Sequence, residues 1–266
     1  MVAALTGIAT IAAYLVAVRA YGKRYPQRGF SVLRILSFVC GTALMTAAVL
    51  PPIDAAVDAS FAAHMVQHLV LTLVGPPLLL LGAPLLLLVS LPSPRTGRAV
   101  SRIARHPVAL ALLSPVLGWL LFIGALWSVH FTALYELALR NEAAHVAEHL
   151  LLIATAILFW MPVVQVGYAP RPLPFPTRML YLFLAIPPGA FLGLTIFSTR
   201  YVLYAHYEIG RTPAQALADQ QNAGALMWIA GGAVLFTAFM ATAAMWAARE
   251  RDDIVAPHCF RAPPPG

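Results

Sequence analysis

The fold is indicated most strongly by residues 61–90, which read FAAHMVQHLVLTLVGPPLLLLGAPLLLLVS and contain no Asp, Glu, Lys or Arg. A helix needs about 20 mostly apolar residues to cross the hydrocarbon core of a bilayer, so this stretch predicts a transmembrane helix. The prolines in Gly75-Pro76-Pro77 and Gly82-Ala83-Pro84 predict bends within it, because proline removes a backbone donor.

The rest of the 266-residue chain has the same character: 61% of its residues are hydrophobic and 10% are charged. A soluble domain carries about 25% charged residues, so most of this surface is expected to face lipid. We therefore predict an all-α polytopic membrane protein, one domain over residues 1–266 with a flexible tail from about 249. Its transmembrane helices, about seven by length, are predicted at 2–18, 32–50, 61–90, 108–127, 142–161, 179–199 and 219–247.

The cationic residues predict how the chain crosses the membrane. Of the 17 Lys and Arg residues, 14 fall in the breaks after the first, third and fifth stretches, just beyond them or in the tail. Only Arg140, Arg200 and Arg211 fall in the other breaks. Because cations accumulate on the cytoplasmic side, the N-terminus is predicted outside and the C-terminus in the cytoplasm. The net charge of +7 is assigned to this bias and not to nucleic-acid binding.

Six of the eight histidines fall on the predicted outer side, and four of them form spaced pairs. His64 and His68 open one predicted helix, and His145 and His149 open another. Residues four apart lie on one helical face, so each pair presents two imidazoles in one direction. Two such pairs at one depth predict a shared metal site, since imidazole suits copper, zinc, iron and nickel.

Asp219 is expected to begin the last helix at the same level, either as a helix cap or as a functional carboxylate. The predicted metal-binding residues are therefore His64, His68, His145, His149 and Asp219. The alternative for the histidines is an interfacial role in capping or hydrogen bonding. His130 and His206 are predicted to be surface residues of outer loops. Whether His130, His206, Glu148 and Met227 contribute to the site is left open.

Several local runs together resemble the membrane-embedded cytochrome c oxidase assembly factors of the CtaG family. They are His64-Met-Val-Gln-His68, Gly75-Pro-Pro, His145-x-x-Glu148-His149, Phe159-Trp-Met-Pro-Val163 and Asp219-Gln220 with Ala223-Gly224. The resemblance implies a non-enzymatic protein of the bacterial plasma membrane that helps to mature a haem–copper oxidase. Its implied partners are oxidase subunits and the lipid bilayer, and its implied cargo is copper. The five residues predicted above are its motif positions, and that they hold copper at the outer face is inferred from their residue types and depth.

Two other functions remain open on the same residues. A membrane oxidoreductase could hold haem b between one histidine of each pair, although i, i+4 pairs point their imidazoles the same way. A zinc or di-iron enzyme is favoured by Glu142-x-x-His145, which has the carboxylate–histidine spacing of such sites. The second Glu-x-x-His that these sites use is missing, which makes this function less favoured than haem binding.

Overall fold

The computed structural model describes residues 2–90, 102, 106–166 and 172–255, and among these residues every regular element is helical. The prediction of an all-α fold is confirmed. The elements are α1 (Val2–Arg24), α2 (Val32–Ala48), α3 (Pro51–Ala59), α4 (Phe61–Leu69), a π-helical turn (Val70–Val74), α5 (Gly75–Leu81), α6 (Pro84–Ser90), α8 (Pro107–Leu112), α9 (Pro115–Phe131), α10 (Ala133–Arg140), α11 (Glu142–Trp160), α12 (Phe175–Ser198), a 3-10 turn (Ala205–Glu208) and α13 (Pro213–Val255).

Five helical segments in the described part of the chain are long and apolar enough to cross a membrane. The number rises to seven when each of two bent pairs, α2 with α3 and α9 with α10, is taken as one span. The bend between α9 and α10 is 72°. By length and composition these helices support a multi-pass membrane protein, whereas the direction in which the chain crosses the membrane stays a prediction.

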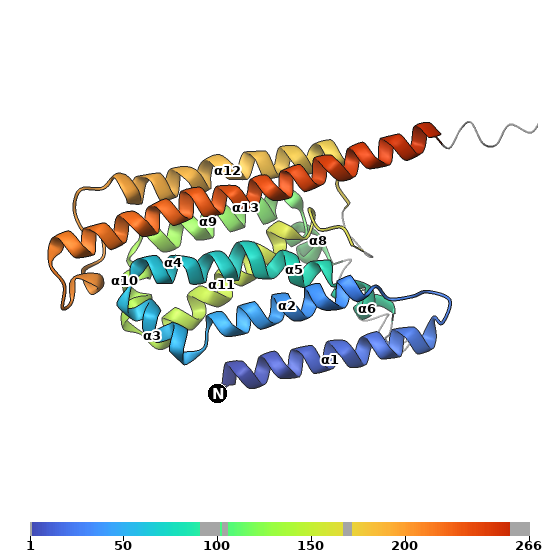
Figure 1. The fold of residues 1–266 in the computed structure, drawn as a ribbon, viewed down its shortest axis with the longest axis horizontal. Coiled ribbons are helices and arrows are strands. Elements are labelled where there is room, and N and C mark those ends of the chain that lie inside the picture. Colours follow the sequence, from blue (N-terminus) through green and yellow to red (C-terminus); the bar gives the residue numbers. More distant parts are fainter. Residues whose placement is uncertain (1, 91–101, 103–105, 167–171, 256–266) are drawn as a thin grey trace, which may run out of the picture.

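The long helices run side by side along one axis (Figure 1). The pair α12 and α13 forms one edge of the bundle, α1 forms the opposite edge, and α4, α5 and α11 lie between them. The short helices α3 and α10 and residues 199–212 gather where α4 begins. We call this part of the bundle the histidine end, and the part around Trp160, where α11 finishes, the far end.

The predicted helix at 61–90 is divided into three helices, and proline chemistry explains the first division. Pro76 has no N–H, so the carbonyl of Thr72 lacks the donor that a continuous helix would supply. The indole N–H of Trp160 donates to that carbonyl instead, at 2.9 Å. The chain forms a π-helical turn directly before Gly75, and α5 ends at Leu81, before Ala83 takes a left-handed φ of 52°.

The last helix begins earlier than predicted, at Pro213 and not at Asp219. Thr212 and Gln215 form a reciprocal cap, in which each side-chain oxygen accepts from the backbone N–H of the other, at 3.0 and 3.3 Å. Asp219 therefore lies inside α13 and cannot cap it. Because α13 continues to Val255, the tail predicted from 249 is helical that far.

Other boundaries also differ from the prediction. Helix α12 starts at Phe175, and Pro187 and Pro188 lie within it without ending it. Some residues used in the predictions lie outside the described part of the chain: the arginines at 95, 98, 105, 171 and 261 and residues 256–266 of the tail.

Helices α12 and α13 approach closely at a pair of glycines. A Cβ added to Gly224 would lie 2.5 Å from the backbone nitrogen of Phe197, and one added to Gly193 would lie 2.7 Å from the carbonyl oxygen of Gly224. At Gly232 an added Cβ would meet no atom within 4 Å. Close contact at Gly224 therefore holds the histidine end of these helices together, whereas Gly232 faces open space.

Candidate metal centre

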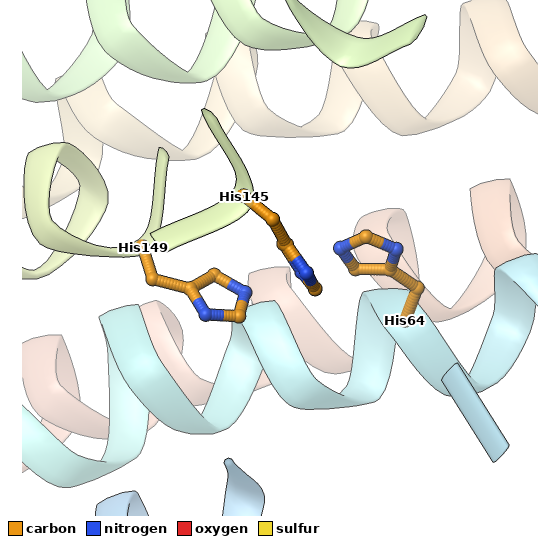
Figure 2. A group of neighbouring side chains, drawn as sticks. All are labelled: His64, His145 and His149. Carbon is orange, nitrogen blue, oxygen red and sulfur yellow. The ribbon is translucent and has the colours of Figure 1, made fainter. Parts of the chain in front are cut away.

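The two histidine pairs meet inside the histidine end. The ring centroid of His64 in α4 lies 5.3 Å from that of His145 and 6.3 Å from that of His149, both in α11. The rings of His68 and His149 are 5.5 Å apart. Figure 2 shows the imidazoles of His64, His145 and His149 directed into one space between the two helices. The prediction that the pairs are neighbours is confirmed, and metal binding itself stays a prediction.

The histidines are more deeply buried than an interfacial role allows. Their exposed fractions are 0% for His64, 4% for His68 and 9% for His149. An imidazole that capped a helix at the membrane surface would keep contact with water or lipid headgroups. The interfacial alternative therefore does not fit these three residues.

Glu148 joins the histidines from the same face of α11. Its exposed fraction is 7%, and its Oε1 lies 3.6 Å from Nε2 of His68. Two groups of ligand atoms result, each with all members within 4.8 Å of one another. One group is His64, His145 and His149, and the other is His64, His68 and Glu148.

Several of these buried atoms have no hydrogen-bond partner among the described residues. They are Nδ1 of His68, Nε2 of His145, Nε2 of His149 and both carboxylate oxygens of Glu148. A buried polar atom left unpaired costs about 1–3 kcal/mol. A bound cation would relieve that cost, because these nitrogen and oxygen atoms are acceptors of the kind that bind transition metals. The donor set therefore fits a metal ion.

His64 is held by two tyrosines on its other side. Its Nδ1 lies 2.9 Å from the Tyr207 hydroxyl and 3.1 Å from the Tyr135 hydroxyl, while its Nε2 faces Nε2 of His68 at 3.0 Å. Burial raises the pKa of Tyr207, which lies in the 199–212 segment, so this phenol keeps its proton at neutral pH. Metal-binding histidines are commonly fixed in this way by a hydrogen bond to the second ring nitrogen.

Asp219 is not part of either group and has a different set of contacts. Its carboxylate accepts from the backbone N–H of Phe61 at 2.7 Å and from the Ser60 hydroxyl at 2.8 Å. It also pairs with Arg211 at 3.0 Å, and Arg211 donates to the carbonyl of Ala59. Asp219 therefore caps the start of α4, where a negative charge is favourable. This contact fixes the helix that carries His64.

The prediction for His130 is wrong. It is not a surface loop residue, because it lies at the end of α9 with an exposed fraction of 3%. The bend between α9 and α10 folds the chain back over it, and the Tyr204 hydroxyl donates to its carbonyl at 2.8 Å. His206 lies half-buried in the 3-10 turn and belongs to neither group.

The sequence contains a signal for Glu148, whose contribution was left open above, but none for the other residues around the histidines. Glu148 lies three positions after His145, which places the two on one face of α11. Tyr135, Tyr207 and His130 come from separate elements and have no spacing relation to the histidine pairs. Their proximity depends on how α9, α10 and residues 199–212 fold over α4.

Comparison with known proteins gives one family. Residues 12–249 match the family described as cytochrome c oxidase caa3 assembly factor. No solved structure gives a significant match.

Curated relatives come from mycobacteria. The chain is 28% identical over 262 residues to an uncharacterised protein of Mycobacterium leprae (strain TN), covering 93% of the chain and 38% of that protein. It is 26% identical over 250 residues to uncharacterised proteins of Mycobacterium bovis and Mycobacterium tuberculosis, covering 90% of the chain and 37% of each. The chain thus spans less than two fifths of the length of these relatives.

Proposed function

The chain belongs to the cytochrome c oxidase caa3 assembly factor family, and on that premise we propose that it handles copper for a haem–copper oxidase in its buried histidine–glutamate cluster. The cluster consists of His64, His68, His145, His149 and Glu148. Family membership supports an oxidase-related partner and a membrane setting. The proposed role is binding and transfer of the ion and not catalysis.

The observation that carries this proposal is the set of unpartnered acceptor atoms in the cluster. Four imidazoles and a carboxylate from two helices surround one space, and five of their buried polar atoms have no hydrogen-bond partner in the described part of the chain. Around a tetrahedral ion with bonds of about 2.0–2.1 Å, ligand nitrogens stand about 3.3 Å apart. The 3.0 Å between Nε2 of His64 and Nε2 of His68 is close to that separation.

The geometry supports a single ion better than haem b. Pockets that hold cofactors measure about 300–1,000 Å³. The cavity beside the cluster, lined in part by His68 and His130, measures about 50 Å³. A porphyrin would have to separate α4 from α11 at the histidine end, whereas an ion would need only small changes of side-chain rotamer.

We further propose that the histidine end faces the outside of a bacterial plasma membrane. The described cations Lys23, Arg24, Arg178 and Arg251 lie on segments at the opposite end. Cations of membrane proteins concentrate in the cytoplasm. Copper would then reach the cluster from the outer face of the membrane.

The test is oxidase assembly in cells that lack the endogenous protein and are grown with limiting copper. The double substitution His145→Ala/His149→Ala should abolish the absorption spectrum of the assembled oxidase in these cells. Added copper should restore part of that absorption by mass action. His106→Ser is the matched control, because His106 is exposed and lies outside the cluster, and the serine hydroxyl can replace the His106 side chain that caps α8. Normal oxidase assembly by the double variant, present at wild-type level in the membrane, would refute the proposal.

A further inference from the structure

A second pair of metal-binding side chains lies beside the cluster but belongs to neither group of ligands. Sδ of Met65 in α4 is 3.4 Å from Nε2 of His130 at the end of α9. Their exposed fractions are 0% and 3%. The pair is therefore fully enclosed by protein.

The hydrogen bonds of His130 fix where its proton lies. Its Nδ1 is 2.7 Å from the carbonyl oxygen of Leu126, and a carbonyl only accepts, so Nδ1 carries the hydrogen. In the neutral ring Nε2 is then a lone-pair acceptor, and the thioether sulfur of Met65 has no proton to donate. Two lone pairs thus face each other, and the neutral side chains cannot form a hydrogen bond.

The space around this pair accommodates an ion. Met65, His130, His68 and Met227 line a cavity of about 50 Å³ whose other walls are largely apolar. A site needs about 10–15 Å³ of such volume to hold one water molecule, so a single ion fits. His68 belongs to both places: its Nε2 faces His64, and its Nδ1 has no partner in the described part of the chain.

We infer that Met65 and His130 form a second copper position, specific for copper(I) and linked to the first by His68. Thioether sulfur is a soft ligand of the kind that binds copper(I), and it disfavours hard ions such as magnesium, calcium and manganese. A histidine that donates its Nδ1–H to a backbone carbonyl is already arranged to bind a metal through Nε2. Copper(I) would pass between the positions by exchange of ligands, with no change of oxidation state. The inference rests on the proposed copper function and adds to it the oxidation state and a sulfur ligand.

The test is anaerobic loading of the detergent-purified full chain with copper(I), followed by copper counting and copper-edge X-ray absorption. Wild-type protein should show sulfur in the first coordination shell. Met65→Leu, which preserves side-chain volume and should fold, should remove the sulfur signal and about one equivalent of copper. Met161→Leu is the control, because this partly buried methionine packs at the far end.

The outcomes separate this inference from the proposed function. Copper bound through nitrogen and oxygen alone would refute the second position but would agree with copper binding by the cluster. If no copper is bound, both the second position and the proposed copper function are refuted. A sulfur signal that persists in Met65→Leu would also overturn the assignment. Should that variant fail to fold, His130→Gln must lower the copper count in the same way, and an unchanged count would refute the inference.

Discussion

The far end and the histidine end of the bundle both bury polar side chains, but the two ends differ in whether these side chains form hydrogen bonds. At the far end Trp160 donates to the carbonyl of Thr72 at 2.9 Å, and Tyr181 donates to the carbonyl of Phe159 at 3.0 Å. At the histidine end both oxygens of Glu148 and one nitrogen each of His145 and His149 are buried without a partner.

The contrast separates a folding core from a binding site. Buried polar groups are normally satisfied, since each unpaired one costs about 1–3 kcal/mol. The far end obeys this rule at Trp160 and Tyr181, where side-chain donors satisfy carbonyls that helix geometry leaves free. The histidine end violates it repeatedly within one cluster. Single unpaired atoms also occur elsewhere, such as Nε1 of Trp119 in the core around Trp160, whereas the histidine cluster gathers five of them, as expected where the free atoms serve a ligand.

The largest expected effect concerns the packing that holds the histidine end together. Gly224→Ala should lower the free energy of unfolding by about 3 kcal/mol, because the new methyl group meets backbone atoms of α12 that cannot move separately. Thermal unfolding in detergent measures the change. Gly232→Ala is the control, with open space around its added Cβ. Equal melting temperatures of the two variants would contradict close packing at Gly224.

At the far end, Trp160→Phe should cost about 2 kcal/mol, because the Thr72 carbonyl loses its donor while the aromatic ring is retained. Copper binding should change little, since Trp160 lies outside both ligand groups. Thermal unfolding and copper titration of the same sample measure the two effects. A Trp127→Phe variant at a partly exposed position provides the baseline for replacing a tryptophan. If Trp160→Phe lost copper binding but kept its stability, the far end would belong to the binding site and not to the folding core.

Tyr207→Phe tests how the histidine end is held in place. The substitution removes the hydroxyl 2.9 Å from Nδ1 of His64, so copper affinity should fall about tenfold, the lower range for loss of such a supporting bond. Competition with a copper chelator measures the affinity. Tyr201→Phe, at an exposed position in the same segment, should leave it unchanged. Equal affinities of the Tyr207 and Tyr201 variants would remove Tyr207 from the site.

The smallest expected change is a gain in stability, whereas Gly224→Ala and Trp160→Phe are expected to lower stability. Glu148→Leu should raise the stability of the metal-free protein by about 1 kcal/mol, because a buried carboxylate without hydrogen bonds is replaced by an apolar side chain of similar size. The same variant should bind copper more weakly. Thermal unfolding after chelator treatment measures the first effect. A destabilised metal-free variant would indicate that Glu148 supports the fold and is not kept for a ligand.

The fold was predictable where it depends on local sequence. Apolar stretches such as 142–161 locate the helices, because crossing a bilayer requires a fixed length of apolar chain. The division at Val70–Val74 follows from Pro76, although a bend alone could not indicate a π-helical turn. The apolar stretch does not indicate the start at Pro213, because a reciprocal cap between Thr212 and Gln215 begins the helix among polar residues ahead of Asp219.

Helical periodicity made the two histidine pairs of the site predictable, but not the residues that surround them. The pairs His64/His68 and His145/His149 share faces by their spacing, and a neighbouring position of their helices brings them together. The positions of Tyr135, Tyr207 and His130 required knowledge of how α9, α10 and residues 199–212 fold over α4. The burial of Asp219 against α4 likewise depends on contact between α13 and α4, which no local pattern encodes.

The most direct test of the account is the copper content of the detergent-purified full chain after loading and removal of free metal. Wild-type protein and His106→Ser should retain copper equally. His145→Ala/His149→Ala should lose the copper held by the cluster while keeping a folded helical spectrum. If the double variant retains as much copper as wild type, or if wild type retains none, the buried acceptors of the histidine end do not constitute a copper site.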